Sequence, residues 1–274
     1  MARSRAAAAL FATSARADVT TPFAADLWPD MSGRESFVAW MKAHRGEEPL
    51  YLGQRWDRYL QLIGHADVWD AADERAFLMT PREEFVRTVN LSRAYEWHHL
   101  NIGFGVAITG PRAVARMTNT LAVRPGDKAL EIGTGSGYQS AYLSCLTDKL
   151  WTIEIQPPFA KRTRLLYDAL ISRGYSEYRA ITTKTADGYY GWEDAAPFDK
   201  IIVTRGIDHI PAPLLQQLAP GGIMVIPVGS PGAQHVIKAT KTKGADGVFG
   251  DVRSDIHGGA IIPFVPFTGG HQGA

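Results

Sequence analysis

The sequence has no excess of charge of either sign, only one cysteine and no long apolar run. The 29 lysines and arginines nearly balance the 28 aspartates and glutamates, which leaves a formal net charge of +1. This balance gives no electrostatic reason to expect nucleic acid or an anionic membrane as a partner. Cys145 stands alone and excludes an intramolecular disulfide, and no stretch reaches the roughly 20 apolar residues of a transmembrane helix. We therefore expect no nucleic-acid partner, no membrane partner and a cytoplasmic location.

Composition divides the chain into three regions. Residues 1–30 begin with arginines and a short alanine run that partly resembles a secretory signal, but Arg16 lies where a cleavage region should be uncharged. We predict a flexible tail there. Residues 31–110 carry aromatic residues at helical spacing and end in a stretch with three glycines, which predicts a helical segment followed by a loop or short hairpin. Residues 111–270 form the main domain.

The main domain alternates short apolar runs with amphipathic helical stretches. Such alternation predicts an α/β fold with a doubly wound, mostly parallel sheet that helices cover on both faces. We expect an additional edge strand at Ile261–Phe267. The other strands are expected at the apolar runs Ala129–Ile132, Leu150–Ile155, Tyr178–Thr182, Lys200–Thr204, Ile223–Val228 and Val236–Ala239.

A glycine-rich loop follows the first of these strands. Glu131 closes the strand, and Gly133, Gly135 and Gly137 recur at every second position before a predicted helix, with Thr134 between the first two. Glycines permit a tight turn and let the backbone approach a ligand closely, while the helix start supplies free N–H groups. An acid before the loop favours a ligand's ammonium group and would repel phosphates. The pattern therefore suits S-adenosylmethionine better than a dinucleotide.

Two further acids end the next strands. Glu154 lies 23 residues after Glu131, where a carboxylate accepts hydrogen bonds from both hydroxyls of a ribose, a feature shared with NAD sites. Asp187, followed by Gly188, comes after the third strand and is expected to accept from the adenine amine. Because ligands of this fold class bind at the carboxyl edge of the sheet, the three acids predict an S-adenosylmethionine site there. A dehydrogenase fits the loop spacing less well.

Several strings of the chain resemble one known family, the protein-L-isoaspartate O-methyltransferases. The similarity extends from about Asp73 to Gly269 and keeps the family's order. Its strings are Thr80–Val86, Leu130–Gln139, Asp187–Trp192, Ala196–Thr204, Leu214–Gly222, Ile226–Gly229 and Phe264–Phe267. The resemblance implies a Rossmann-like class I methyltransferase that transfers the methyl group of S-adenosylmethionine to the carboxylate of isoaspartyl residues in peptides and proteins. Thr204, which closes one matching string, joins the expected cofactor-binding residues.

The sequence departs from the family on the side of the methyl acceptor. The family's Gly-Gln-Thr-Ile-Ser-x-Pro loop reads Gly105–Pro111 here, and apolar residues replace the glutamine and the threonine. Thr109 keeps a hydroxyl where the family has a substrate-proximal serine, so it is the first candidate catalytic residue. Ile108 and His98 are expected to contact the acceptor, together with Trp97, which stands where the family usually has an aspartate.

A second departure follows the fourth strand. The family's Thr-Ala-Ala reads Thr204–Gly206 here, and Asp208 and His209 come soon after. Because an unpaired charge beside the methyl donor would be costly, Arg205 either pairs with an internal acid such as Asp208 or Glu96, or binds an anionic acceptor bidentately. We favour the second interpretation, which makes Arg205 the second candidate catalytic residue and places His209 among the acceptor-binding residues.

Three functions are compatible with these patterns. The first is carboxyl O-methylation of an isoaspartyl or related carboxylate, and the second is methylation of a diverged acceptor, either a modified peptide or a small-molecule acid. The third is a catalytically weakened cofactor-binding protein with a regulatory or assembly role. A nucleic-acid methyltransferase would show a basic patch or an Asn/Asp-Pro-Pro-aromatic string, and this sequence has neither. No metal site is predicted, because adjacent His98 and His99 face different ways and no third ligand is indicated. A homodimer is left open.

Overall fold

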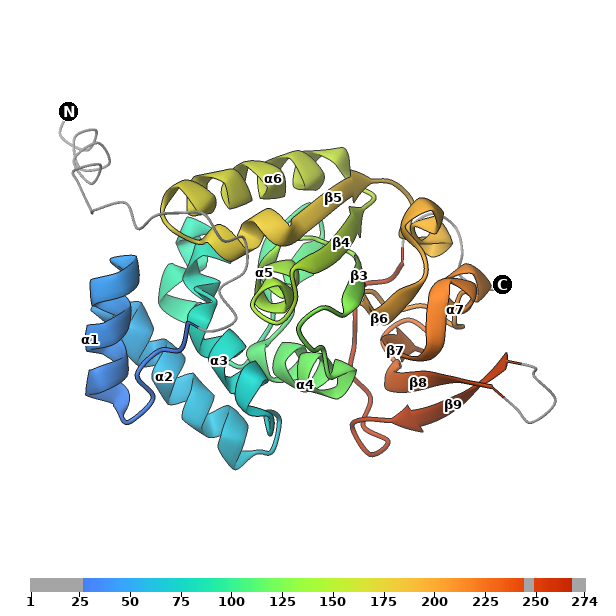
Figure 1. Cartoon of the computed structure of the whole chain (residues 1–274), viewed down its shortest axis with the longest axis horizontal. Coiled ribbons are helices and arrows are strands. Elements are labelled where there is room, and N and C mark those ends of the chain that lie inside the picture. The colour runs from blue at the N-terminus through green and yellow to red at the C-terminus, as the bar shows by residue number, and fades with distance from the viewer. Residues whose placement is uncertain (1–26, 244–248, 268–274) are drawn as a thin grey trace.

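A central sheet of seven strands organises the molecule, whose computed structural model describes residues 27–243 and 249–267 (Figure 1). The strand order is β5-β4-β3-β6-β7-β8-β9; the pairs β7–β8 and β8–β9 are antiparallel and the other neighbouring pairs are parallel. The strands are β3 (Lys128–Ile132), β4 (Lys149–Glu154), β5 (Ile181–Thr185), β6 (Phe198–Val203), β7 (Leu218–Val228), β8 (His235–Lys243) and β9 (Phe249–Asp255). A separate antiparallel hairpin consists of β1 (Leu100–Gly103) and β2 (Val106–Ile108). The predicted α/β fold with a mostly parallel sheet is confirmed.

Helices lie on both faces of this sheet. α4 (Pro111–Leu121), α5 (Tyr138–Ser144) and α6 (Pro157–Ser172) cover one face, and α7 (Ala212–Gln217) covers the other. The helices that precede them in the chain are α1 (Arg34–Arg45), α2 (Pro49–Gly64) and α3 (Ala71–Met79). Short 3₁₀ helices occupy Arg82–Phe85, Thr88–Arg93, Ser176–Ala180, Gly188–Tyr190 and Glu193–Ala195. None of the helices in these described ranges is long and apolar enough to cross a membrane.

The residues of the central strands alternate between two hydrophobic clusters. Ala129 and Ile202 point to the face that α4, α5 and α6 cover, whereas Leu130, Ile132 and Ile201 point to the face that α7 covers. Both faces of β3 are buried, which is why this strand reads as an apolar run with one acid rather than as a polar–apolar alternation. The carboxyl ends of β3, β4 and β6 therefore meet at one edge of the sheet.

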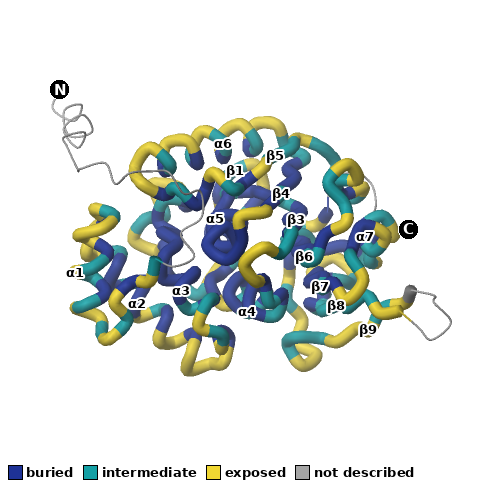
Figure 2. Tube along the Cα trace, viewed as in Figure 1, coloured by how far each residue is buried: buried dark blue, intermediate teal, exposed yellow. Residues whose placement is uncertain are grey.

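The N-terminal helices add a further layer outside α5. α1 and α2 lie at one end of the molecule and the β8–β9 hairpin lies at the other (Figure 1), and α5 is buried along its whole length (Figure 2). α3 covers α5: the rings of Phe77 and Tyr142 contact each other, and the Tyr142 hydroxyl donates to the carbonyl of Asp73 at 3.0 Å. One hydrophobic cluster extends from Phe37 to Phe264. The division of the chain at residue 110 stays a prediction.

Two predicted strands need correction. Tyr178 lies in the 3₁₀ helix Ser176–Ala180, where its ring stacks on Tyr175 at 5.5 Å between centroids, and β5 begins only at Ile181. Ile261–Phe267 does not form an edge strand; a single bridge at Pro266 and a few backbone hydrogen bonds hold it against residue 206 and residue 234. Its two prolines lack the N–H groups that a ladder requires. Most of the predicted flexible tail, residues 1–26, lies outside the described residues, as do residues 268–270 of the predicted domain.

Candidate active site

The glycine-rich loop connects the end of β3 to the start of α5. Gly133, Gly135 and Gly137 all have positive φ values, 96°, 53° and 91°, which side chains with a Cβ rarely adopt. The N–H groups of Gly133 and Thr134 donate to the carbonyl of Ile153 at 2.9 and 3.2 Å, which ties the loop to β4. The loop thus owes its tight course to glycine at the positions that the sequence indicated.

Gly137 serves the packing of the loop. A Cβ on this residue would lie 2.6 Å from Thr163 Cγ2 and from the Tyr167 hydroxyl, which itself donates to the Gly137 carbonyl at 3.0 Å. Glycine is therefore required for α6 to approach the loop. Gly137 does not line either of the two cavities described below, so its predicted contact with the cofactor stays a prediction.

Glu131 is fully buried below the loop. One oxygen, Oε2, accepts hydrogen bonds from Ser140 and, at 2.7 Å, from Thr152. Among the described residues the other oxygen, Oε1, has no partner. Burial raises the pKa of this carboxyl to about 8, although the two hydroxyls lower it in part. An acid held away from water with one unsatisfied oxygen is a ready partner for a cation.

Glu154 lies at the end of β4, beside the loop. Its two carboxylate oxygens accept from the backbone N–H groups of Gly135 at 2.8 Å and Gln156 at 2.9 Å. These contacts fix the carboxylate at the carboxyl edge of the sheet and leave lone pairs for additional donors. Asp187 accepts from the N–H of Tyr189 at 2.9 Å in the turn after β5.

Thr204 and Gly188 shape the floor of the site. The Thr204 hydroxyl lies 2.8 Å from the Gly133 carbonyl and 3.0 Å from that of Ile132, both of which accept from it. A Cβ on Gly188 would come within 2.4 Å of Ile132 Cγ2, and a Cβ on Gly133 would come within 2.6 Å of the Thr204 hydroxyl. Both glycines therefore allow the close contact of β3, β6 and the segment after β5.

Two hollows open at this edge of the sheet. The larger has a volume of about 280 Å³. Its lining joins the glycine-rich loop to the hairpin and the C-terminal segment and comprises His99, Val106–Thr109, Val114, Met117, Glu131, Gly133–Ser136, Tyr138, Gln139, Thr204, Arg205 and Pro263–Val265. The smaller is lined by Ile132, Gly133, Ile153–Ile155, Gly188, Arg205 and Phe267. Gly133 and Arg205 line both cavities, so they stand where the two meet.

The side chain of Arg205 lies across the glycine-rich loop. Its Cγ stands 3.2 Å from where a Cβ of Gly133 would be. The guanidinium forms no ion pair within the described part of the chain; of the two acids predicted as alternatives, Asp208 pairs with His209 and Glu96 pairs with Arg93. Burial lowers the pKa of Arg205, and the nearby charge of Glu154 raises it in part. The cation therefore lines both cavities without an ion-pair partner in residues 27–243 and 249–267.

The structure brings some of the predicted acceptor residues together and leaves others outside. Thr109 and Ile108 line the larger cavity together with the glycine-rich loop. Trp97 does not line it; its ring instead lies 3.7 Å below the guanidinium of Arg58 from α2. His98 is exposed, and His209 is held by Tyr189 and Asp208 outside both cavities. These three positions do not match the predicted acceptor contacts.

His99, rather than the predicted His98, lies at the cavity where the acceptor is expected to bind. His99 lines the larger cavity, immediately before β1. His98 lies in the bend before β1 and does not line this cavity, and the sequence carries no signal for which of the two adjacent histidines does so. Tyr138 and Gln139 also line the cavity although we did not predict them as site residues. Their position at the start of α5, directly after the loop, was the available signal.

Comparison with known families agrees with this geometry. The model of the protein-L-isoaspartate(D-aspartate) O-methyltransferase family matches residues 61–271. The chain belongs to this family. A protein-L-isoaspartate O-methyltransferase of Cupriavidus necator is 42% identical over 194 residues, which cover 70% of this chain and 69% of the relative. One from Nitrosococcus oceani is 38% identical over 237 residues, which cover 85% of this chain and 99% of the relative.

Solved structures of the same family share the fold. A structure named protein-L-isoaspartate O-methyltransferase superposes with a TM-score of 0.66 at 22% identity, over 80% of this chain and 67% of the other. A Plasmodium falciparum structure described as such a methyltransferase, in complex with S-adenosyl-L-homocysteine, gives a TM-score of 0.63 at 18% identity, over 77% and 97%. The family match begins at residue 61, so α1 and most of α2 precede it.

Proposed function

We propose that the chain is an S-adenosylmethionine-dependent methyltransferase that methylates the free carboxylate of isoaspartyl residues in peptides or proteins. The relatives that bear this activity in their names are 38–42% identical to it over most of their length. The observation that carries the proposal is the larger cavity, whose lining joins the glycine-rich loop and Glu131 to Thr109 and Arg205. A donor site and an anion site therefore share one space.

The residues around the loop fit the donor. Glu131 Oε1 is buried and lacks a partner among the described residues, so the ammonium of an amino-acid tail would satisfy it and would favour its ionised form. Glu154 offers a carboxylate fixed by two backbone N–H groups beside the smaller cavity, as a ribose requires. The full set that would hold the donor is Glu131, Gly133, Thr134, Gly135, Gly137, Glu154, Asp187, Gly188 and Thr204. When bound, S-adenosylmethionine supplies an activated methyl group.

Thr109 and Arg205 are the groups that would hold the acceptor. The Thr109 hydroxyl donates to one carboxylate oxygen, and the guanidinium of Arg205 binds the carboxylate by charge-assisted hydrogen bonds. The apolar Val106, Ile108 and Phe264 exclude water from the same cavity. A carboxylate is ionised at neutral pH, so the chain need not provide a general base. Its task is to orient the acceptor and to remove its hydration shell.

The two alternative functions are less well supported. A cofactor-binding protein without activity would not need an acceptor pocket, and the larger cavity retains a hydroxyl and a cation there. A small-molecule acid as acceptor suits the additional cation of Arg205, but the relatives named above favour a protein or peptide. Assembly as a homodimer and a cytoplasmic location stay predictions.

Initial rates with a panel of carboxylates test the proposal. The panel contains an isoaspartyl peptide, its aspartyl twin of identical sequence and several small dicarboxylic acids, each with labelled S-adenosylmethionine. We expect methylation of the isoaspartyl peptide and a rate at least about 100-fold lower for its twin, because the twin places the carboxylate on a different arm of the backbone. Turnover of a small acid with none of the isoaspartyl peptide would contradict the proposal, and so would donor binding with no turnover on any acceptor.

A further inference from the structure

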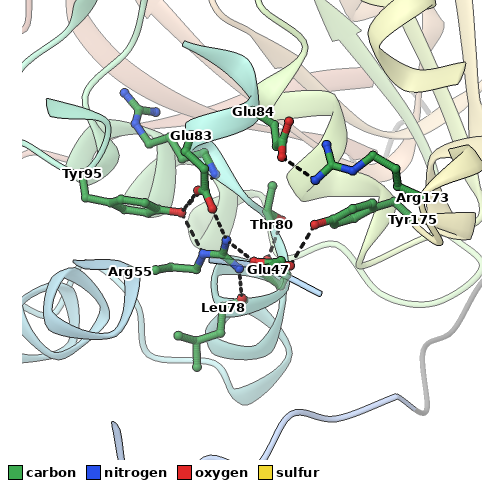
Figure 3. A network of polar contacts seen from close by, with 11 residues as sticks. Glu47, Arg55, Leu78, Thr80, Glu83, Glu84, Tyr95, Arg173 and Tyr175 are labelled. Carbon is green, nitrogen blue, oxygen red and sulfur yellow. Dashed lines mark hydrogen bonds and ion pairs between the residues drawn. The ribbon is translucent and has the colours of Figure 1, made fainter. Parts of the chain in front are cut away.

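Arg55 of α2 is the centre of a buried network of polar side chains. Arg55 is completely buried, and its guanidinium binds Glu47 at 2.6 Å and Glu83 at 2.9 Å (Figure 3). The same guanidinium donates to the Leu78 carbonyl at 2.8 Å and to the Tyr95 hydroxyl at 2.7 Å. Arg55 precedes the residues that the family model matches, whereas Glu83 and Tyr95 lie within them. The network thus links α2 to the part of the chain that the family model matches.

Tyr95 is the branch of this network that faces the active site. Its hydroxyl donates to Glu83 at 2.5 Å and accepts from Arg55 and from the backbone N–H of Arg82, the latter at 3.1 Å. A second arginine of α2, Arg58, donates to the Tyr95 carbonyl at 2.6 Å and covers the ring of Trp97. α2 therefore holds both the side chain and the backbone of the segment that leads to His99.

Arg82 continues the path to the cavity. It is buried, and its guanidinium donates to the carbonyls of Ala94 and Thr109, both at 2.7 Å. It also lies 4.8 Å above the ring of Tyr138, which lines the larger cavity. A Cβ on Gly110 would come within 2.2 Å of the Trp97 carbonyl, so the backbones of the two acceptor-side segments are in direct contact. A chain of hydrogen bonds thus runs from α2 to the residue that carries the candidate hydroxyl.

We propose that α2 positions two parts of the acceptor side of the cavity, His99 and Val106–Thr109, through Arg55, Tyr95 and Arg82. This inference rests on the proposed function in one respect, that this side of the cavity receives the acceptor. Arg55, Tyr95 and Arg82 are positioning residues, since they act through the backbone of Thr109 and of the segment before β1. The N-terminal segment is accordingly a part of the acceptor site rather than an independent attachment.

A second branch of the network provides a matched control. The Tyr175 hydroxyl donates to Glu47 at 2.9 Å, on the far side of Arg55, and the guanidinium of Arg45 lies 4.5 Å above its ring. Tyr95 and Tyr175 are both buried, and the hydroxyl of each donates to a glutamate bound by Arg55. Tyr175 lies after α6 and does not line either cavity. The two phenylalanine variants therefore remove the same group from the same network on opposite sides.

The experiment compares Y95F with Y175F in the full chain. We expect Y95F to raise the KM for an isoaspartyl peptide about five- to tenfold, because two donors lose their acceptor, while the affinity for S-adenosylhomocysteine stays within about twofold of wild type. We expect Y175F, which removes one hydrogen bond of the same network, to lower the melting temperature and to leave the peptide KM unchanged. R58A, at a half-buried position, removes the hydrogen bond to the Tyr95 carbonyl and should reproduce the Y95F effect more weakly.

Hydrogen exchange of the wild type and the two variants gives a readout that does not depend on turnover. Faster exchange of the amides of residues 98–109 in Y95F, but not in Y175F, is expected. Equal exchange in the two variants would overturn the proposal, as would equal peptide KM values. If the wild type failed to methylate the isoaspartyl peptide, the proposed function would fall, while the exchange data would still decide whether α2 holds this segment.

Discussion

The donor side and the acceptor side of the cavity are built in different ways. The donor side consists of the ends of three adjacent parallel strands, and its groups are fixed by contacts within a few residues of the strands themselves, such as the bonds of Gly135 and Gln156 to Glu154. The acceptor side combines the segment before β1, the hairpin, residue 205 and the C-terminal segment. Its backbone is held from α2 and from the buried Arg82. The donor side is thus fixed by the strand ends and the turns that follow them, whereas the acceptor side depends on side chains that reach it from α2 and from Arg82.

The two sides therefore differ in what constrains their residues. A strand end cannot move without disturbing the sheet, so the glycines and acids of the donor side are constrained by the fold as well as by the ligand. The acceptor side depends on side chains such as Arg55 and Arg58 that reach across the molecule. The departures from the family fall on this second side. The following predictions separate the two sides, beginning with the largest expected effect.

Glu131→Gln should strongly weaken the binding of the methyl donor, with little direct effect on the binding of the acceptor. The variant keeps the shape of the side chain but removes the charge that faces the ligand's ammonium, and an uncompensated buried partner costs about 3 kcal/mol or roughly 100-fold in affinity. Calorimetric titration with S-adenosylhomocysteine measures the loss. An affinity within threefold of wild type would show that Oε1 does not face the donor.

The same variant should alter the pH dependence of stability. The pKa of Glu131 is about 8 in the fold and near the ordinary value of 4.5 in the unfolded chain, so the native state holds a proton that the unfolded state releases between these values. Wild-type stability therefore falls as pH rises from about 5 to 8, by on the order of 3 kcal/mol, whereas the glutamine of the variant does not titrate. Melting curves of the ligand-free proteins should show E131Q gaining on the wild type across this range. A constant difference would contradict the burial argument.

Arg205→Ala should damage the acceptor side alone. We expect the KM for an isoaspartyl peptide to rise about 10- to 100-fold, the value of a charge-assisted hydrogen-bonded pair, with kcat reduced less. Arg205→Lys keeps the charge but loses the bidentate geometry and should recover only part of the effect. Steady-state kinetics at saturating donor provide the comparison. An unchanged peptide KM in both variants would remove Arg205 from the acceptor site.

Thr109→Val should lower kcat/KM for the peptide about three- to tenfold. The substitution keeps the branched shape and removes a single neutral hydrogen-bond donor, which is worth about 1 kcal/mol. Thr109→Ser retains the hydroxyl and should remain close to wild type. If the serine variant were as impaired as the valine variant, the methyl group rather than the hydroxyl would be the important feature.

The smallest expected effect separates two adjacent histidines. His99→Ala removes a side chain that lines the cavity and should change the peptide KM about two- to fivefold. His98→Ala, at an exposed position that does not line the cavity, should leave the peptide KM unchanged. Both variants should bind the donor normally. A larger change of the peptide KM in His98→Ala than in His99→Ala would show that His98, as predicted from the sequence, contacts the acceptor.

The sequence was sufficient for the fold and for the course of the glycine-rich loop. Apolar runs and glycine spacing predict the parallel strands and the course of the loop, because both arise from local chain geometry. Trp97 could not be placed in this way, since its partner Arg58 lies on α2 and only the tertiary packing brings them together. The 3₁₀ helix at Tyr178 has a similar origin, because burial of aromatic rings overrode a strand-like pattern.

Arg205 lines both cavities, and its role at the acceptor stays a prediction. A charge at a strand end next to the glycine-rich loop has few directions available, and among the described residues Asp208 pairs with His209 and Glu96 pairs with Arg93. Loops lack this constraint. The side chains of His98 and His209 depend on contacts that no spacing rule describes, and they lie outside the cavities.

Substitution of Arg205, where the donor and acceptor sides meet, should affect acceptor binding without affecting donor binding. The most direct measurement is a pair of binding and kinetic constants on one preparation of R205A, the Kd for S-adenosylhomocysteine and the KM for an isoaspartyl peptide. We expect the Kd for S-adenosylhomocysteine to stay within about threefold of wild type and the KM for the peptide to rise at least about tenfold. A Kd weakened tenfold with an unchanged peptide KM would contradict it and would assign Arg205 to the donor.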